Sequence, residues 1–354
     1  MRRRHTIQPR QRFVKIESGG LGMSGTHNIL VIGAGSIGER HLRCFQSTGR
    51  CQLALCETMP ERREVIAEKY GVPSYASLNE ALASGKHDAA VIAAPAPFHV
   101  SIARQLTGHG VHLLLEKPVS ISMDGVEELA DEVANAGTQV NVGYMMRGLP
   151  ALSQMREAVR SGRFGQPVQL VVTAGQNFPF YRPAYREIYY ADPAMGGGAI
   201  QDCITHHLNA AEWLVGPITR LVADSEHCVL EGVTVEDTVH VITRHKNVLG
   251  SFSVNQHQAP NEFFMTVLCE RGAARFQMIG QRWYSAQQAG GEWQLEAEHP
   301  AERDDYYIMQ ANAFLDQIEG KRRPVCSLAA GIQTLKVNIA ILESVMTRTW
   351  KDIA

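Results

Sequence analysis

The stretch Asn28-Ile-Leu-Val-Ile-Gly-Ala-Gly-Ser-Ile-Gly38 decides how the first part of this chain folds. Its first five residues form a short apolar run without polar alternation, which is typical of a strand buried on both faces of a parallel sheet. The glycines that follow open a predicted helix, and a G-x-G-x-x-G in this strand–turn–helix context indicates a dinucleotide site. The first glycine permits a tight turn, the second lets a pyrophosphate approach the backbone, and the third lets helix and strand pack closely. Since helix amides would face the phosphates, the cofactor contacts predicted in this loop are Gly33, Gly35, Ser36, Ile37 and Gly38.

The same rhythm of strand and helix continues beyond this loop. Similar apolar runs lie at residues 52–56, 89–93, 111–115 and 140–142. Helical patterns separate them, near residues 37–48, 61–70, 98–109 and 123–136. Such alternation implies βαβ units in a parallel, doubly wound sheet. We therefore expect a Rossmann domain over residues 26–146.

One acidic residue follows the second run. Glu57 lies nineteen residues beyond Gly38, where a carboxylate binds the ribose 2′-hydroxyl of a dinucleotide. A carboxylate there repels a 2′-phosphate, so the expected cofactor is NAD, with NADP less favoured. Arg62 and Arg63 could soften that preference, although solvated charges in the first turn of a helix are the favoured interpretation of these two residues.

The pattern changes after about residue 165, where strands follow one another without helices between them. They are expected at residues 169–173, 220–227, 238–243, 250–254, 263–269 and 274–278. This predicts an α+β domain over residues 147–354, with a large, mostly antiparallel open sheet and helices near 150–161 and 198–215 on one face. The last helical stretches, near 304–319 and 328–349, could return to the first domain. The predicted fold is thus α/β, a Rossmann sheet followed by a second, sheet-based domain.

Glu116-Lys117-Pro118 stands at the carboxyl end of the run 111–115. Ligands of doubly wound sheets bind outside the carboxyl ends of the strands. Proline biases Lys117 away from the helical conformation, so its ammonium group could point toward a ligand. A solvated surface lysine is the alternative.

A second candidate for chemistry lies in the helix expected near 198–215. Asp202 and His206 are four residues apart, which makes them neighbours on one helix face. Histidine exchanges protons near neutral pH, and an adjacent carboxylate would orient it and raise its basicity. A surface ion pair is one alternative. A metal site is another, but it needs a third ligand that the sequence does not supply, so no metal is expected.

Composition excludes several classes of function. The net charge is −2 and 45% of the residues are hydrophobic, so nothing indicates nucleic acid or an anionic membrane as a partner. No apolar run approaches the ~20 residues of a spanning helix. Seven cysteines without a C-x-x-C pair favour a reduced, cytoplasmic protein. Residues 1–25 are basic and lack a signal peptide's apolar stretch; they indicate a disordered tail, a true start at Met23, or, less favoured, a basic targeting or nucleic-acid arm.

Several motifs in order resemble the glucose-fructose oxidoreductase / inositol dehydrogenase / MocA-like (Gfo/Idh/MocA) family. The glycine loop continues to His41, as in the family's G-x-G-x-x-G-x-x-H start. The other matching segments are Ala94-Pro-Ala-Pro-Phe-His99, Glu116-Lys-Pro118, Val142-Gly-Tyr-Met-Met-Arg147, Gly162-Arg-Phe-Gly165, and Gly197-Gly198 through Asp202-x-x-x-His206. The chain departs from the family at Ala94 and Ala96, which replace threonine and asparagine, and in the apolar residues between Asp202 and His206.

The resemblance implies a sugar, polyol or similar alcohol as substrate, bound between the two domains, and a homodimer or homotetramer assembled through the open sheet. It implies that Lys117, Asp202 and His206 are catalytic and that the Lys117–Pro118 peptide is cis. Further cofactor contacts are then expected from Pro95, His99, Glu116 and Lys117. Substrate contacts are expected from Lys117, Tyr144, Arg147, Tyr181, Tyr185, Asp202 and His206.

The expected reaction is reversible oxidation of a hydroxyl group. His206 would accept the hydroxyl proton, Asp202 would orient His206, and Lys117 would stabilise the developing negative charge on oxygen; whether Lys117 or His206 is the formal base stays open. The segment 181–190 is rich in tyrosine and arginine, which suits sugar contacts and a subunit interface equally well. Two alternative functions keep the fold: recycling of bound NAD to assist glycoside cleavage or isomerisation, and non-catalytic sensing of the cofactor.

Overall fold

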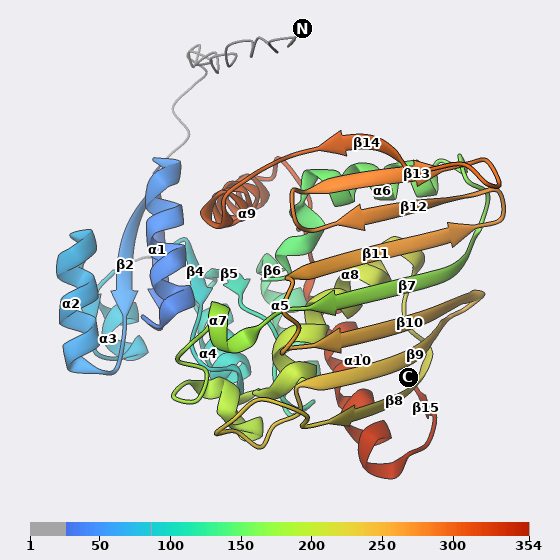
Figure 1. The fold of residues 1–354 in the computed structure, drawn as a ribbon. Coiled ribbons are helices and arrows are strands. Elements are labelled where there is room, and N and C mark those ends of the chain that lie inside the picture. Colours follow the sequence, from blue (N-terminus) through green and yellow to red (C-terminus); the bar gives the residue numbers. More distant parts are fainter. Residues whose placement is uncertain (1–25, 86, 354) are drawn as a thin grey trace, which may run out of the picture.

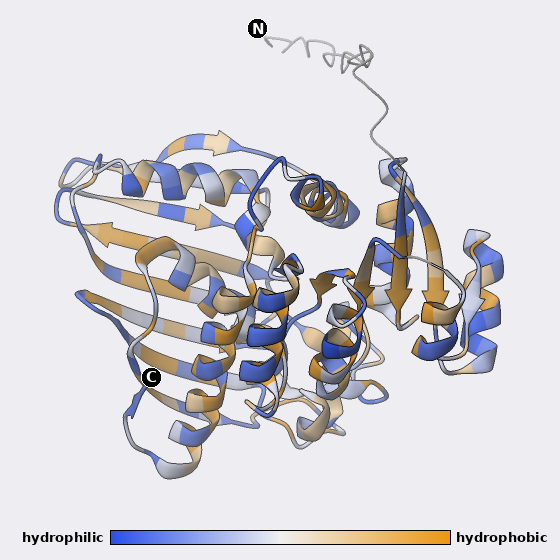
Figure 2. Ribbon diagram, turned by 180° about the vertical axis from the view of Figure 1, so that it is seen from behind, coloured by the Kyte–Doolittle hydropathy of each residue, from blue (hydrophilic) through white to orange (hydrophobic). Residues whose placement is uncertain are grey.

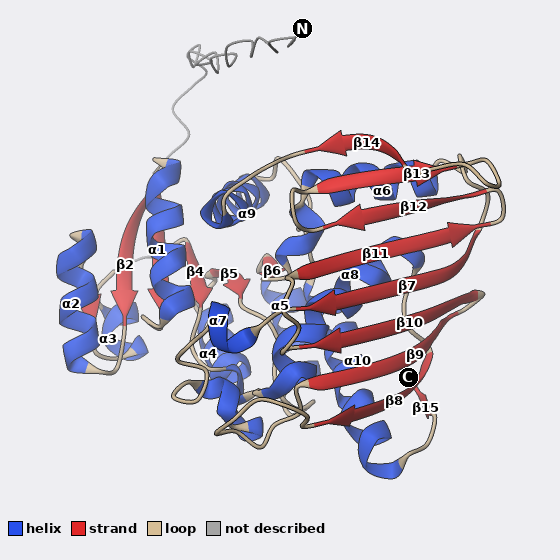
Figure 3. Ribbon diagram, viewed as in Figure 1, coloured by secondary structure: helices blue, strands red, loops and turns tan. Residues whose placement is uncertain are grey.

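The computed structural model describes residues 26–85 and 87–353 of the chain (Figure 1). The tail predicted over residues 1–25 and the alternative start at Met23 lie outside the described residues. Two sheets dominate the described part, one with six strands and one with nine, and helices flank both of them (Figure 3).

The first sheet is parallel and has the order β3-β2-β1-β4-β5-β6. Its strands are β1 (His27–Ile32), β2 (Cys51–Cys56), β3 (Ser74–Tyr75), β4 (Ala89–Ile92), β5 (His112–Leu115) and β6 (Val140–Val142). Its helices are α1 (Ser36–Thr48), α2 (Pro60–Tyr70), α3 (Leu78–Ala83), α4 (His99–Thr107) and α5 (Val126–Ala136). The order of the strands reverses between β1 and β4, the place where such sheets bind ligands. Strand β3 and helix α3 escaped prediction because two and six residues are too few to show a period.

The second sheet has the order β14-β13-β12-β11-β7-β10-β9-β8-β15, and within it β7 and β10 pair in parallel. Its strands are β7 (Pro167–Gly175), β8 (Arg220–Glu226), β9 (Thr238–His245), β10 (Val248–Asn255), β11 (Glu262–Cys269), β12 (Gly272–Gln277), β13 (Arg282–Ala286), β14 (Gln294–Glu298) and β15 (Lys351–Asp352). The predicted fold class, a Rossmann sheet plus a large, mostly antiparallel sheet, is confirmed. The three strands that were not predicted lie toward the sheet's edges, where β14 is only five residues long and mostly exposed.

Three helices cover one face of this second sheet, namely α6 (Pro150–Arg160), α8 (Thr205–Val215) and α10 (Leu328–Thr347). Figure 2 shows them in front of the sheet, which they meet through an apolar core. Leu152, Leu208 and Ile341 from these helices pack there with Phe252 and Met265 from the strands. The sheet therefore buries one side of each strand, and side chains such as Ile242 point the other way and stay exposed.

Two late helices contact the first sheet's layer. Phe314 of α9 (Arg303–Ile318) is fully buried beside Phe45 of α1, with ring centroids 6.3 Å apart. Leu335 of α10 packs in the core formed by β4, β5 and β6. Helix α10 is the one described helix long and apolar enough to span a membrane by length and composition, although half of that stretch is buried. Our statement that no run approaches that length therefore holds only for uninterrupted apolar runs.

Candidate active site

The glycine loop has the conformation that its sequence predicts. Gly33 has a φ of +91°, and a Cβ added there would lie 2.7 Å from the Ala93 carbonyl oxygen. A Cβ on Gly38 would lie 1.9 Å from the Gly33 carbonyl oxygen, so strand and helix can approach only because both residues are glycine. A Cβ on Gly35, by contrast, meets no atom within 4 Å.

Helix α1 begins directly after Gly35, and no side chain caps its first amides. Uncapped amides and the helix dipole together make an anion site. The open space at Gly35 leaves room for a phosphate group beside them. The loop Gly33–Gly38 therefore fits the diphosphate of a dinucleotide.

Glu57 follows β2 and is tied to this loop. Its Oε2 accepts a hydrogen bond from the Ala34 amide at 2.8 Å, and its Oε1 accepts one from the Met59 amide at 2.9 Å. Each carboxylate oxygen has a second lone pair, so Glu57 can still accept a ribose hydroxyl. The side chain thus fixes the loop in addition to the cofactor contact expected of it.

His99 is buried beside the turn that carries Lys117. It is 1% exposed, and its two ring nitrogens lie 2.8 Å from the carbonyl oxygens of Pro118 and Ala94. Both ring nitrogens therefore have partners inside the protein, and the expected cofactor contact of His99 stays a prediction. Pro95 precedes the short 3₁₀ turn Ala96–Phe98, and its cofactor contact stays a prediction.

Glu116 is buried in contact with a residue from the cofactor helix. His41 of α1 donates through Nε2 to Glu116 Oε1 at 2.7 Å, and the second oxygen accepts the Lys117 amide at 3.2 Å. Burial alone would raise the pKa of Glu116, but the hydrogen bond and charge of His41, with Lys117, hold it below its ordinary value. Glu116 therefore orients the Lys117 backbone, and its direct cofactor contact stays a prediction. The Lys117–Pro118 peptide is cis, as the resemblance implied.

Lys117 and Asp202 form a shielded ion pair between the end of β5 in the first sheet and the segment before α8, which covers the second sheet. Lys117 Nζ donates to Asp202 Oδ1 and to the Asp202 carbonyl oxygen, both at 2.9 Å. The two side chains are 13% and 5% exposed. Burial alone would lower the pKa of Lys117, but the Asp202 carboxylate outweighs it and holds that pKa well above its ordinary value. Lys117 is therefore a charged donor rather than a free base.

Two residues that the sequence analysis did not assign complete this cluster. Tyr189 donates its hydroxyl hydrogen to Asp202 Oδ1 at 2.7 Å, and Arg182 Nη1 lies 3.7 Å from Asp202 Oδ2. Burial would raise the pKa of Asp202, but Lys117 and Arg182 hold it well below its ordinary value. The tyrosine- and arginine-rich segment 181–190 was the available signal, but spacing alone did not show which of its members face Asp202.

His206 lies near this ion pair but does not pair with Asp202, which corrects the expected orienting contact. Residues Ala199–Ile204 form a π-helical segment, and α8 begins only at Thr205. The wider turn changes the angular spacing of residues four apart, so Asp202 turns toward Lys117. Burial and the Lys117 charge hold the pKa of His206 well below its ordinary value, which leaves its imidazole neutral at neutral pH.

The predicted substrate residues Tyr144 and Tyr185 are buried, each 1% exposed. The Tyr144 hydroxyl shares a 2.8 Å hydrogen bond with Thr205, and its ring meets that of His206 edge-on at 5.9 Å. Tyr185 donates to the Glu231 carbonyl oxygen at 2.6 Å. The hydroxyl groups of both residues have partners inside the protein, and their substrate contacts stay predictions. Tyr181 is 46% exposed, and its substrate contact stays a prediction.

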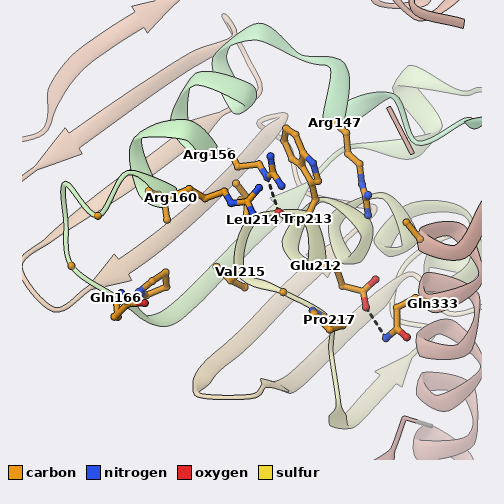
Figure 4. A pocket seen from close by; sticks show the side chains of 16 residues that line it. Arg147, Arg156, Arg160, Gln166, Glu212, Trp213, Leu214, Val215, Pro217 and Gln333 are labelled. Carbon is orange, nitrogen blue, oxygen red and sulfur yellow. Dashed lines mark hydrogen bonds between the residues drawn. The ribbon is translucent and has the colours of Figure 1, made fainter. Parts of the chain in front are cut away.

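Arg147 lies in a separate cavity of about 630 Å³ (Figure 4). It donates to the Asn209 side chain at 2.6 Å and to the Asn209 carbonyl oxygen at 3.1 Å. In the same cavity, Arg156 donates to the Trp213 carbonyl oxygen at 2.9 Å. These arginines bond carbonyl groups of α8, so the predicted contact of Arg147 with the substrate of Lys117 is not supported by its position.

Two family models match consecutive parts of the chain. A model described as an oxidoreductase family with an NAD-binding Rossmann fold matches residues 27–144. A model of the GFO/IDH/MocA C-terminal domain matches residues 152–275. The first therefore covers the glycine loop and Lys117, and the second covers Asp202 and His206.

Individual relatives and solved structures have low sequence identity to this chain. MocA, a rhizopine catabolism protein of Rhizobium meliloti, is 25% identical over 198 residues, 55% of this chain and 60% of its own length. A 1,5-anhydro-D-fructose reductase of Ensifer adhaerens is 24% identical over 329 residues, 90% of this chain and 96% of its own. The WlbA dehydrogenase from Bordetella pertussis, solved with NADH and UDP-GlcNAcA, has a TM-score of 0.81 at 23% identity and covers 94% of this chain and 99% of that one. This last likeness shows the fold.

Proposed function

Because this chain belongs to the GFO/IDH/MocA family of NAD-binding oxidoreductases, we propose that it interconverts a hydroxyl and a carbonyl group of a sugar, a polyol or a related small molecule. The observation that carries this proposal is the Lys117–Asp202 ion pair beside the neutral His206. The names of relatives support the substrate class, since they include an inositol 2-dehydrogenase of Burkholderia cenocepacia and a D-xylose 1-dehydrogenase of Haloferax volcanii. MocA, the inositol enzyme and the xylose enzyme are each spanned by this chain over only 55–61% of their length.

The glycine loop and Glu57 would hold the cofactor, and a bound nicotinamide dinucleotide supplies the hydride acceptor or donor. Gly35 leaves the space for the diphosphate, and the first amides of α1 face it. Glu57 would accept a ribose hydroxyl and repel a 2′-phosphate. NAD is therefore preferred to NADP.

Three side chains would remove the proton of the reacting hydroxyl group and stabilise the charge that develops on its oxygen. In the oxidation direction, the substrate C–H bond breaks and its electron pair leaves as hydride, while His206 takes the hydroxyl proton through its neutral imidazole. Lys117 keeps its own proton and stabilises the negative charge that develops on oxygen. Asp202 holds Lys117 charged and in place. His206 is thus the base, and Lys117 the electrostatic partner.

The assembly inferred for the enzyme is a homodimer or homotetramer formed through the open face of the second sheet. Ile242 of β9 and Leu249 of β10 point away from the helices and are 51% and 43% exposed. Apolar side chains on an otherwise uncovered sheet face favour burial against a second copy. The seven cysteines are all free, which supports the reduced, cytoplasmic environment expected from the sequence.

A panel of sugars and polyols, followed by NADH absorbance with and without added NAD, tests the proposed reaction. We expect turnover that depends on added NAD and falls by at least about 100-fold in His206→Ala, because general-base catalysis contributes roughly 10²- to 10⁴-fold. His109→Ala, at an exposed position after α4 and outside the second sheet, is the matched control. Turnover without net NADH, with NAD retained through purification, would instead indicate a recycled cofactor. Bound NAD with no turnover of any substrate would indicate a sensor.

A further inference from the structure

Two cations lie within 4.0 Å of the Asp202 carboxylate. One carboxylate faces two cations there, Lys117 at 2.9 Å and Arg182 at 3.7 Å. Lys117 makes direct hydrogen bonds to Asp202, whereas no hydrogen bond joins Arg182 to that carboxylate among the described residues. The Arg182 side chain is also 36% exposed, against 13% for Lys117. The Lys117 charge is therefore neutralised by Asp202, and the Arg182 charge remains partly available to a ligand.

A further cation lies within electrostatic range of Arg182. Arg303, the first residue of α9, is partly shielded from water and has no carboxylate within 4.0 Å in the described part of the chain. Burial is the largest cause that lowers the pKa of Arg303, and the charges of Arg40 and Arg182 lower it further. Arg40 has its own partner in Asp304 at 2.9 Å. Arg182 and Arg303 are thus two interacting cations: Arg182 shares the Asp202 carboxylate with Lys117, and Arg303 has no carboxylate within 4.0 Å among the described residues.

Arg186, four residues after Arg182, is a useful comparison because its side chain bonds only other parts of the protein. It donates to the Glu231 carbonyl oxygen at 2.8 Å and stacks on Tyr185 at 4.7 Å. The Arg182 side chain has no hydrogen bond to a backbone carbonyl group among the described residues; its guanidinium group contacts Tyr189, Asp202 and the Phe178 ring at 5.3 Å. The exposed aromatic side chain of Tyr181 precedes Arg182 directly, so an apolar face and a charge adjoin each other.

We propose that the substrate is an anionic sugar or polyol derivative, bearing a carboxylate or phosphate group that Arg182 binds and that Arg303 attracts. This inference rests on the proposed function, because it assigns a substrate class to the same site. Two like charges near each other are unfavourable until an anion joins them, and a guanidinium group matches the geometry of carboxylates and phosphates. An oxidised nicotinamide ring adds one more positive charge, which increases the need for a negative one.

Matched substrates test the proposal on the NAD-loaded enzyme. Each series contains a neutral sugar, the corresponding uronate or aldonate, and the corresponding sugar phosphate. The measurements are kcat and KM from NADH absorbance and, independently, binding to the NAD-saturated protein by calorimetry. We expect an acidic member to exceed its neutral parent in kcat/KM by at least about 10-fold, and the better of carboxylate and phosphate identifies the anionic group.

Substitutions of Arg182 test whether this side chain causes the preference for acidic substrates. In Arg182→Gln we expect the ratio of acidic to neutral kcat/KM to fall roughly 10- to 100-fold, the range that one charge-assisted hydrogen bond supplies, with most of the loss in KM. Arg182→Lys should recover part of the ratio because it keeps the charge. Arg186→Gln should leave the ratio unchanged, and NAD affinity checks that each variant is folded.

The outcomes separate this inference from the proposed function. Equal or better turnover of neutral members, or a ratio unaltered in Arg182→Gln, overturns the anionic substrate and leaves the oxidoreductase standing. Tight binding of acidic members without turnover supports the anionic ligand and contradicts the proposed reaction. No binding and no turnover of any member contradicts both.

Discussion

Replacing Asp202 with Asn tests whether the Asp202 carboxylate keeps Lys117 charged. The substitution removes one negative charge 2.9 Å from Lys117 Nζ and keeps a side chain of similar size. At an effective dielectric constant of about 20, a pair at that distance interacts by about 5–6 kcal/mol. Since about 1.4 kcal/mol corresponds to one pKa unit, this loss is large enough to bring the titration of Lys117 into the range of an ordinary assay. Burial and the nearby Arg182 charge then lower the pKa of Lys117 against the smaller raising effect of Tyr189.

The pH dependence of kcat/KM for hydroxyl oxidation measures this change. In the natural protein the raised pKa keeps the ammonium group present throughout the assay range. In Asp202→Asn, activity should fall as pH rises through the lowered pKa, because the stabilising charge is lost. One electrostatic donor contributes roughly 10²- to 10³-fold, which sets the expected depth of the alkaline decline.

Tyr189→Phe is the matched control for this experiment. It removes a hydrogen bond to the same Asp202 oxygen, at 2.7 Å, and leaves the carboxylate charged. It should reduce activity without adding an alkaline decline. An Asp202→Asn profile parallel to that of the natural protein would refute the electrostatic role assigned to Asp202.

Three other predictions concern the cofactor loop, the base and the helix that returns to the first domain. Gly35→Ala should fold normally, since its Cβ meets no protein atom within 4 Å, but it should weaken NAD binding as measured by calorimetry. Gly38→Ala should fail to fold, as circular dichroism would show, because its Cβ would lie 1.9 Å from a carbonyl oxygen. The lowered pKa of His206 means that its basic form persists as pH falls through 6.5, so an acid decline centred at 6.5 in kcat/KM would contradict its role. Phe314→Ala should cost about 3–5 kcal/mol in the free energy of unfolding, because Phe314 is 0% exposed, as urea denaturation would show.

The local sequence pattern predicts a residue's position in the fold when that position depends only on the strand, turn or helix that contains the residue. The run 28–32 and the glycines after it predict a buried strand, a tight turn and a helix start, and those three features require only near neighbours. Lys117 was placed correctly for the same reason, since the carboxyl ends of parallel strands share one edge of the sheet. Strands β14 and β15 were missed because they are exposed or very short.

The partners of side chains required the tertiary structure. Tyr144, Arg147 and Tyr185 are residue types that suit sugar binding, but hydrogen bonds inside the protein take up their polar atoms. His99 was expected to contact the cofactor, and the structure shows that its ring nitrogens also lie beside the carbonyl oxygens of Pro118 and Ala94, next to the turn that carries Lys117. Burial decides between such roles, and burial depends on segments far away in the sequence.

The sequence by itself determined the dinucleotide fold, the cofactor loop and the presence of Lys117, Asp202 and His206. Only the tertiary structure decided which of these three residues pair with each other and which of them carry a charge. The π-helical segment before α8 turns Asp202 toward Lys117, 85 residues earlier in the chain. That contact leaves Lys117 charged and His206 neutral, because an ion pair in a shielded place stabilises both of its charges and burial disfavours a third.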